Sequence, residues 1–196
     1  MFSLSRVSSR LMGLAILVGV SASAFAQWEP EREKIPLSGQ IGVYYPSNGE
    51  MRQLIGSQVL SIGLRPGGAR VSKAGTISFD IDAVTGSRDG NKVFLLPVTG
   101  TYTYLFNQDE FATTVPYARL HAGLAYMDYA LTRTDPNRGA VGRQSAKVIG
   151  GTGGIEAGLL FNNNLRLSAR YNWFTEPRGF NFNGLQFEVS YVLFRL

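Results

Sequence analysis

The stretch Gly184–Leu196, GLQFEVSYVLFRL, decides the fold class of this 196-residue chain. Its apolar side chains fall on every second position, at Leu185, Phe187, Val189, Tyr191 and Leu193. Polar side chains lie between them, at Gln186, Glu188 and Ser190. Because successive side chains of a β-strand point to opposite faces, this alternation predicts a strand with one apolar and one polar face. The rest of the chain has to indicate what the apolar face contacts.

Residues 1–26 have the layout of a secretory signal peptide. Arg6 and Arg10 precede the apolar run LMGLAILVGV, and the small-residue stretch SASAFA ends at Ala26. The apolar run is about half of the ~20 residues that a membrane-spanning helix needs, which disfavours the alternative of an uncleaved anchor. We therefore expect cleavage after Ala26 and export of the remaining chain.

Composition limits what the exported chain could be. It has no cysteine, which excludes disulfide bonds and a lipid-anchored amino terminus. Without the two arginines of the signal peptide, the net charge of +5 falls to about +3, which is too small and too scattered to indicate nucleic-acid binding. No later stretch is apolar enough for a membrane helix, so any membrane contact would be made by strands. We expect a short amino-terminal segment at 27–35, on the periplasmic side, and one domain at 36–196.

The exported chain carries eight stretches with alternating or strongly strand-forming composition. They are Leu37–Tyr45, Gln58–Leu64, Thr76–Val84, Val93–Leu105, Thr114–Tyr129, Ala146–Phe161, Leu165–Phe174 and Gly184–Phe194. The segments between them are rich in Gly, Asn, Asp and Pro, and no long amphipathic helix intervenes. Strands joined by such turns pair antiparallel. The sequence therefore predicts an all-β fold, an eight-stranded antiparallel up-and-down barrel without unpaired edges.

Each predicted strand separates its side chains into an apolar row and a polar row. The apolar row includes Leu120, Leu124, Leu165, Leu167, Phe187, Val189 and Tyr191. The polar row carries the charged or titratable side chains Asp80, Asp82, Arg119, His121, Glu156, Arg166, Arg170 and Glu188. Small residues share the polar row, at Gly123, Ala125, Gly154, Gly158 and Ser168. A crowded barrel interior requires small side chains, whereas a solvated exterior does not, so the polar row is predicted to face inward.

Two further features favour a transmembrane barrel over a soluble one. Aromatic residues lie near the predicted strand ends, as expected of interfacial girdles, at Tyr45, Tyr104, Tyr126, Tyr129, Tyr171 and Trp173. Strands of about ten residues match what a tilted strand needs to cross a bilayer. We therefore predict that the apolar row faces lipid and the polar row lines the lumen. The alternative from a different class is a soluble periplasmic or secreted barrel that binds an apolar ligand inside.

The connections are predicted to differ between the two ends of the barrel. The longer outer connections are expected at Pro46–Ser57, Thr85–Asn91, Leu131–Arg143 and Thr175–Gly184. In the first of them, Ser47 followed by Glu50 forms a capping-box pattern, which predicts a short helix near Met51–Ile55. The glycine run Gly150–Gly154 lacks the spacing of a phosphate-binding loop and indicates a bend in a barrel strand.

Together, the export signal, the eight alternating strands and the aromatic-aliphatic closing strand resemble the small outer-membrane β-barrel domains of the OmpA, OmpX and OmpW type. The resemblance covers nearly all of the exported chain and rests on pattern rather than on a catalytic signature. It implies a monomeric protein of the outer membrane of a Gram-negative-type bacterium. It also implies outer-membrane lipid, lipopolysaccharide and the barrel assembly machinery as partners, with a further unknown partner at the outer loops.

The charged polar row is open to three interpretations. In a narrow barrel such charges are tolerable only when they pair, so we expect a lumen network of salt bridges that fills the interior. A narrow gated pore is the second interpretation. A metal site on Asp80, Asp82 and His121 is the third, although these residues alone supply few ligands.

Catalysis has little support in the sequence. The chain has one histidine, whose position in the strand pattern places it in the lumen, and no nucleophile can be paired with a base. We therefore expect a non-enzymatic barrel without a catalytic, metal or cofactor site, and with a structural or surface-interaction role.

Overall fold

The computed structural model describes residues 35–196, apart from 108, 110–111 and 135–140. The predicted signal peptide at residues 1–26 and most of the segment predicted at 27–35 lie outside the described residues. Within the described part, no helix is long and apolar enough to span a membrane.

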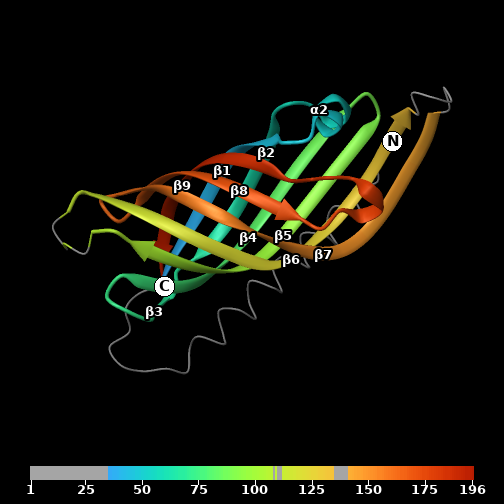
Figure 1. Cartoon of the computed structure of the whole chain (residues 1–196). Helices are drawn as coiled ribbons and strands as arrows, with labels where there is room; N and C mark the ends of the chain where they lie inside the picture. Colours follow the sequence, from blue (N-terminus) through green and yellow to red (C-terminus); the bar gives the residue numbers. More distant parts are fainter. Residues whose placement is uncertain (1–34, 108, 110–111, 135–140) are drawn as a thin grey trace. The chain divides into compact units, whose positions relative to one another are not determined.

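Nearly all of the described chain is antiparallel β-strand. The strands are β1 (Pro36–Pro46), β2 (Val59–Pro66), β3 (Ala69–Arg70), β4 (Gly75–Arg88), β5 (Asn91–Leu105), β6 (Thr114–Thr134), β7 (Val141–Phe161), β8 (Leu165–Phe174) and β9 (Gly184–Arg195). Strand β9 pairs with β1, and β2 pairs with both β1 and β4, so eight strands form a closed ring (Figure 1). The structure confirms the predicted up-and-down barrel. All eight predicted strands are present, several of them longer than expected.

The two ends of the barrel have different connections. We call the end where β1 begins and β9 ends the terminal rim, and the opposite end the loop rim. The β1–β2 connection at the loop rim contains the helix α2 (Gly49–Ile55), and the β8–β9 connection contains the 3-10 turn η1 (Pro177–Gly179). The predicted loop at Thr85–Asn91 is instead a tight turn, since β4 continues to Arg88 and β5 begins at Asn91.

Strand β2 also extends beyond its predicted end at Leu64, and this places an additional charge in the barrel. It continues to Pro66 through its pairing with β1, and β3 resumes the pairing with β4 after Gly67 and Gly68. A Cβ on Gly68 would overlap the Ile77 carbonyl, so this close approach requires glycine. The connection to β4 is therefore only residues 71–74.

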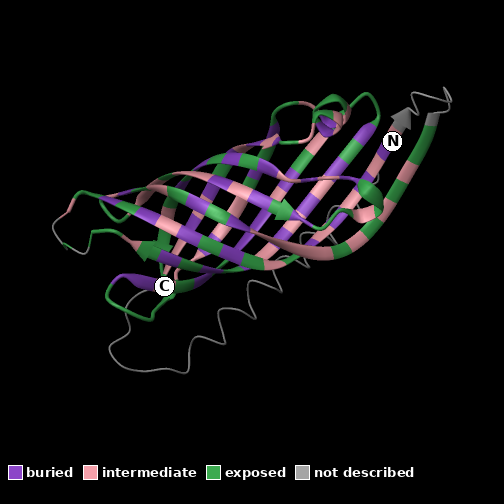
Figure 2. Cartoon of the chain, viewed as in Figure 1, coloured by how far each residue is buried: buried purple, intermediate pink, exposed green. Residues whose placement is uncertain are grey.

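Side chains alternate between the lumen and the outside along every long strand, as Figure 2 shows by the alternation of buried and exposed positions. Nearest the terminal rim and through the middle of the barrel, the outward positions are large and apolar. They include Ile41, Ile62, Phe79, Leu120, Leu124, Ile155, Phe187 and Val189, all at least two-fifths exposed. The lumen at this level is polar.

Towards the loop rim the pattern reverses. The lumen there holds an apolar cluster that includes Tyr44, Val84, Leu95, Met127, Tyr129, Leu131, Phe174, Phe180 and Phe182. On β6 and β7 the outward positions at this level carry polar side chains instead, such as the ion pair Lys147–Asp128. Tyr129 was predicted as part of an interfacial girdle. This was wrong, because its ring packs inside the barrel against Phe180 and Phe182.

The helix α2 covers this apolar cluster. Its Met51 and Ile55 side chains are buried in the cluster, 1% and 5% exposed. The predicted cap residue was wrong by one position: the Asn48 side chain accepts the hydrogen bond from Glu50 N at 2.8 Å. Ser47 instead donates through its hydroxyl to the Asn183 carbonyl at 2.9 Å, which ties the β1–β2 connection to the β8–β9 connection.

Candidate functional site

The lumen contains a buried group of seven charged residues from six strands, which we call the lumen charge cluster. Its members are Arg65, Asp80, Asp82, Arg119, Glu156, Arg170 and Glu188. None of them is more than 4% exposed. Their positions follow from strand register: Arg119, Glu156 and Arg170 lie directly opposite one another on β6, β7 and β8. Inward alternation on a closed sheet therefore brings opposite charges together.

Arg170 contacts all four carboxylates of the lumen charge cluster. Its Nη1 lies 2.5 Å from Asp82 Oδ2, and its Nε lies 3.2 Å from Glu156 Oε2. Its Nη2 reaches Glu188 Oε1 at 3.2 Å and Asp80 Oδ2 at 3.4 Å. Such charge-assisted contacts offset part of the cost of removing the ions from water.

Arg65 is the second guanidinium of the lumen charge cluster, and the sequence analysis missed it. It donates to both oxygens of Glu156, at 3.1 and 3.0 Å, and forms an ion pair with Glu188. The strand was predicted to end at Leu64, because the RPGG sequence that follows is typical of a turn. The inward positions Ser61 and Gly63 would have indicated Arg65 as the next inward residue.

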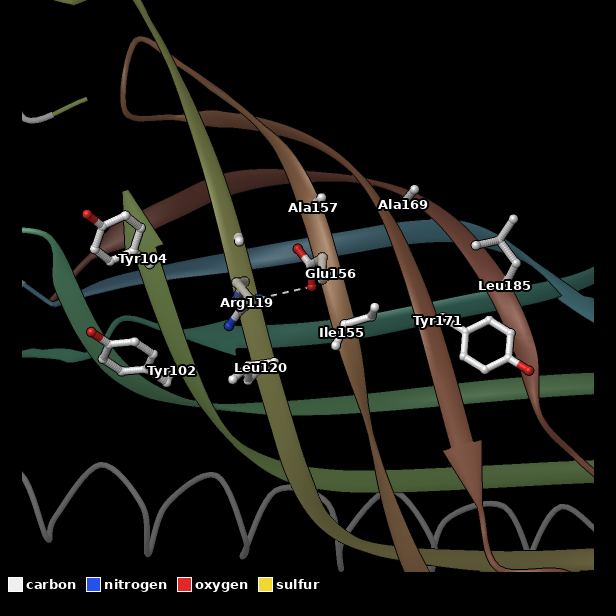
Figure 3. A pocket seen from close by; sticks show the side chains of 11 residues that line it. Tyr102, Tyr104, Arg119, Leu120, Ile155, Glu156, Ala157, Ala169, Tyr171 and Leu185 are labelled. Atoms are coloured by element: carbon white, nitrogen blue, oxygen red, sulfur yellow. Dashed lines mark hydrogen bonds and ion pairs between the residues drawn. The ribbon is translucent and has the colours of Figure 1, made fainter. Parts of the chain in front are cut away.

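Arg119 completes the arrangement. Its Nη2 lies 3.0 Å from Asp80 Oδ1, and its Nη1 lies 3.4 Å from Glu156 Oε2, the contact that Figure 3 marks with a dashed line. The Tyr117 hydroxyl donates to Glu156 Oε1 at 2.7 Å. Glu156 is thus held by three guanidiniums and a phenol, so it is the most heavily coordinated carboxylate of the lumen charge cluster.

Two predicted lumen residues are not direct members of the lumen charge cluster. His121 faces the lumen, but its Nε2 is hydrogen-bonded to Asn172 Oδ1 at 3.1 Å, and Asn172 leads through Gln186 to Glu188. Arg166 has no carboxylate within salt-bridge distance among the described residues. Its guanidinium carbon lies 6.0 Å from the centre of the Tyr117 ring.

The metal interpretation finds no support in the described residues. No group of three potential ligands there is arranged to hold a metal ion. Asp80 and Asp82 are occupied by arginines, and the ring of His121 bonds an amide.

The positions predicted to face lipid all lie on the outward row of their strands. Leu120, Leu124, Leu167, Phe187, Val189 and Tyr191 are exposed, and Leu165 at the start of β8 is partly buried. The described barrel therefore presents apolar side chains outside and paired charges inside at the same level.

Comparison with known proteins identifies the same architecture. No family model and no curated protein sequence matches the chain. Among solved structures, Neisserial surface protein A is similar with a TM-score of 0.51 and 14% identity, over 81% of this chain and 97% of that one. This chain has the fold of a small outer-membrane β-barrel. At this identity the similarity establishes the fold alone.

Two other structures match with TM-scores below 0.5 and add no weight to that conclusion. The outer membrane enzyme PagL has a TM-score of 0.46 and 16% identity, over 79% of this chain and 97% of that one. The Yersinia pestis outer membrane protein Ail has a TM-score of 0.44 and 15% identity, over 81% and 99%.

Proposed function

We propose that this protein is an integral outer-membrane β-barrel with a sealed lumen and a structural or surface-interaction role. The observation that carries the proposal is the polarity of the barrel: exposed large apolar residues surround buried, paired charges. A protein dissolved in water gains nothing from such an exterior, and large contiguous apolar surfaces are rare on soluble monomers. A bilayer makes the same exterior favourable.

The soluble ligand-binding alternative is less consistent with this polarity. It requires the apolar row to line the interior, whereas Leu120, Leu124 and Phe187 are at least half exposed on the outside. The interior that does contain apolar side chains lies near the loop rim and is filled by α2, Phe180 and Phe182.

Two barriers in series support a sealed lumen. The lumen charge cluster spans the interior at one level, with guanidiniums that each bridge several carboxylates. The apolar cluster under α2 follows towards the loop rim. An eight-stranded barrel has an interior just wide enough for side chains to fill.

A surface role is favoured by the shape of the loop rim. Strands β6 and β7 remain paired as far as Thr134 and Val141, whereas β8 pairs with β7 only as far as Thr152. The β6–β7 hairpin therefore projects beyond its neighbour β8 and presents Lys147 and other polar side chains to solvent. Lipopolysaccharide and a protein partner are the contacts we expect there, after insertion by the barrel assembly machinery.

A non-catalytic role is supported by the surroundings of the single histidine. His121 is buried in the lumen, and its described hydrogen bond is to the amide of Asn172. General-base catalysis needs a nucleophile within hydrogen-bond reach and access for a substrate. No nucleophile is hydrogen-bonded to His121 among the described residues.

Fractionation of the cell envelope, followed by gel mobility of unheated and boiled samples in SDS, tests the proposal. We expect the protein in the outer-membrane fraction, with a mobility that shifts on boiling because a closed barrel resists the detergent. Recovery from the soluble periplasm without a shift would contradict it.

A narrow pore is the second candidate, and one observation favours it. The Gln40 side-chain amide, Asp82 Oδ1 and Ser190 Oγ are buried without hydrogen-bond partners in the described part of the chain. They lie in one row of the sheet around Gly63, where the side chains of Gln40 and Asp82 occupy the space beside the glycine. Buried polar groups of this kind are commonly satisfied by water. Single-channel recording in a planar bilayer separates the two functions, since a sealed lumen gives no conductance steps.

A further inference from the structure

The outer wall of the barrel contains a hollow of about 590 Å³ on strands β5 to β9, which we call the alanine trough. Its floor is formed by Ala118, Ala157 and Ala169. Larger residues border it, at Tyr102, Tyr104, Leu120, Ile155, Tyr171 and Leu185 (Figure 3). Arg119 and Glu156 also border it, but their charged ends bind each other in the lumen charge cluster.

Strand register explains the shape of the alanine trough. Ala118, Ala157 and Ala169 lie directly opposite one another on three neighbouring strands. The next outward row towards the loop rim is large throughout, with Leu120 opposite Ile155 and Ile155 opposite Tyr171. Since neighbouring strands are about 4.8 Å apart, three alanines in a row give a floor roughly 10 Å long. The trough is therefore a groove across the strands, one residue wide.

One end of the alanine trough is close to a polar part of the terminal rim. Tyr104 is opposite Gly75, the first residue of β4. A Cβ on Gly75 would lie 2.6 Å from the Tyr102 hydroxyl and 2.7 Å from Ser72 Oγ, so both oxygens border this point. The exposed side chain of Lys73 belongs to the connection at residues 71–74, which also carries Ser72. The groove is thus apolar along its length, with two hydroxyls at one end and Lys73 in the same connection as Ser72.

We propose that the alanine trough binds one acyl chain of a phospholipid in the periplasmic leaflet, with the lipid phosphate near Lys73. This inference rests on the proposed function, because it requires the outer wall to face a bilayer. The charge near the tyrosine end complements a phosphate, and tyrosine favours the interface between hydrocarbon and water. A flexible acyl chain fills a groove one residue wide and recovers dispersion contacts that an empty groove loses.

Quenching of Trp173 fluorescence can test the proposal. The Trp173 ring lies 5.4 Å from that of Tyr171, which borders the alanine trough, and it is exposed. Replacing the only other tryptophan, by Trp28→Phe, leaves Trp173 as the single reporter. The refolded barrel in dodecyl maltoside micelles is titrated with phosphatidylethanolamine that carries brominated acyl chains. We expect quenching that saturates at a low mole fraction of lipid.

Matched variants locate the binding. Ala157→Leu fills the floor of the alanine trough and should raise the half-saturating lipid fraction about ten-fold, equivalent to roughly 1.4 kcal/mol. Ala122→Leu makes the same change on an exposed outward position that lines a separate neighbouring hollow and not the trough, and should leave saturation unchanged. The change Lys73→Ala should weaken binding without altering the trough. Quenching that rises linearly and equally in all variants would overturn the proposal.

Two controls separate the remaining outcomes. Insertion of the same barrel into vesicles of unlabelled phosphatidylethanolamine, read as a gel mobility shift, tests the proposed function independently of the trough. A barrel that inserts but shows no saturable quenching contradicts only the lipid site. Sedimentation in micelles detects a second copy as the occupant. A dimer that Ala157→Leu converts to a monomer would also overturn the lipid assignment.

Discussion

Removing Arg170 should destabilise the barrel through one particular carboxylate. In the variant Arg170→Met, Glu156 keeps Arg65 and Arg119, and Asp80 keeps the same two partners. Asp82 keeps none among the described residues: its Oδ2 contacts Arg170 and its Oδ1 has no partner. One buried charge is thus left uncompensated, which typically costs about 3–5 kcal/mol.

The free energy of unfolding by urea in detergent micelles, followed by Trp173 fluorescence, measures this cost. Arg166→Met is a matched control on the same strand and face, because no carboxylate lies within salt-bridge distance of Arg166 in the described chain. We expect a loss of roughly 3–5 kcal/mol for Arg170→Met and less than about 1 kcal/mol for the control.

The double variant Arg170→Met with Asp82→Asn tests the assignment to Asp82. Neutralising the abandoned carboxylate should recover about 1–3 kcal/mol, as coupling between contacting residues typically does. Equal losses for Arg170→Met and Arg166→Met, or no recovery in the double variant, would refute the reasoning.

Three further outcomes can be measured on the same barrel. Leu120→Arg, at an outward position on β6 that is 60% exposed, should lower the stability in vesicles by roughly 2–4 kcal/mol, whereas Leu167→Arg should cost less because it lies two residues from the start of β8. Met51→Ala leaves a void under α2 and should lower the free energy of urea unfolding by about 2–5 kcal/mol, and an unchanged value would show that α2 does not seal the apolar cluster. Gly90→Ala places a side chain at φ 81° and should cost about 1–3 kcal/mol by the same assay, while Arg88→Ala beside it should be nearly neutral.

Much of the fold was predictable because one face of each strand lines the lumen and the other faces outward, and the two faces carry different kinds of side chain. The alternation on β6, β8 and β9 fixes which side chains point inward, and six of the eight predicted lumen residues meet in the lumen charge cluster. The ends of the strands were harder to predict, because the local sequence does not show when a strand continues into residues that are typical of a turn. Arg65 was missed in this way, since pairing with Ser38 and Leu37 of β1 carries β2 on through Arg65 and Pro66.

The reversed polarity near the loop rim was also missed, although the sequence carries a signal for it. Met127, Tyr129 and Leu131 continue the inward positions of Arg119 and His121, but they are apolar. Their outward neighbour Asp128 is charged. The alternation of inward and outward positions therefore continues along β6, but the apolar side chains move from the outward positions to the inward ones. Assigning one polarity to each face of the whole strand hides this change.

Because of this exchange of faces, apolar side chains stabilise the barrel in two different environments. Near the terminal rim the apolar side chains face outward, so their contribution depends on the lipid or detergent that surrounds them. Under α2 the apolar side chains are removed from water itself, and their burial carries the heat-capacity change and temperature dependence of an ordinary soluble core. Cooling should therefore loosen α2 and the apolar cluster beneath it before it loosens the strands near the terminal rim. A thinner bilayer should instead strain those strands and leave α2 and the apolar cluster unaffected.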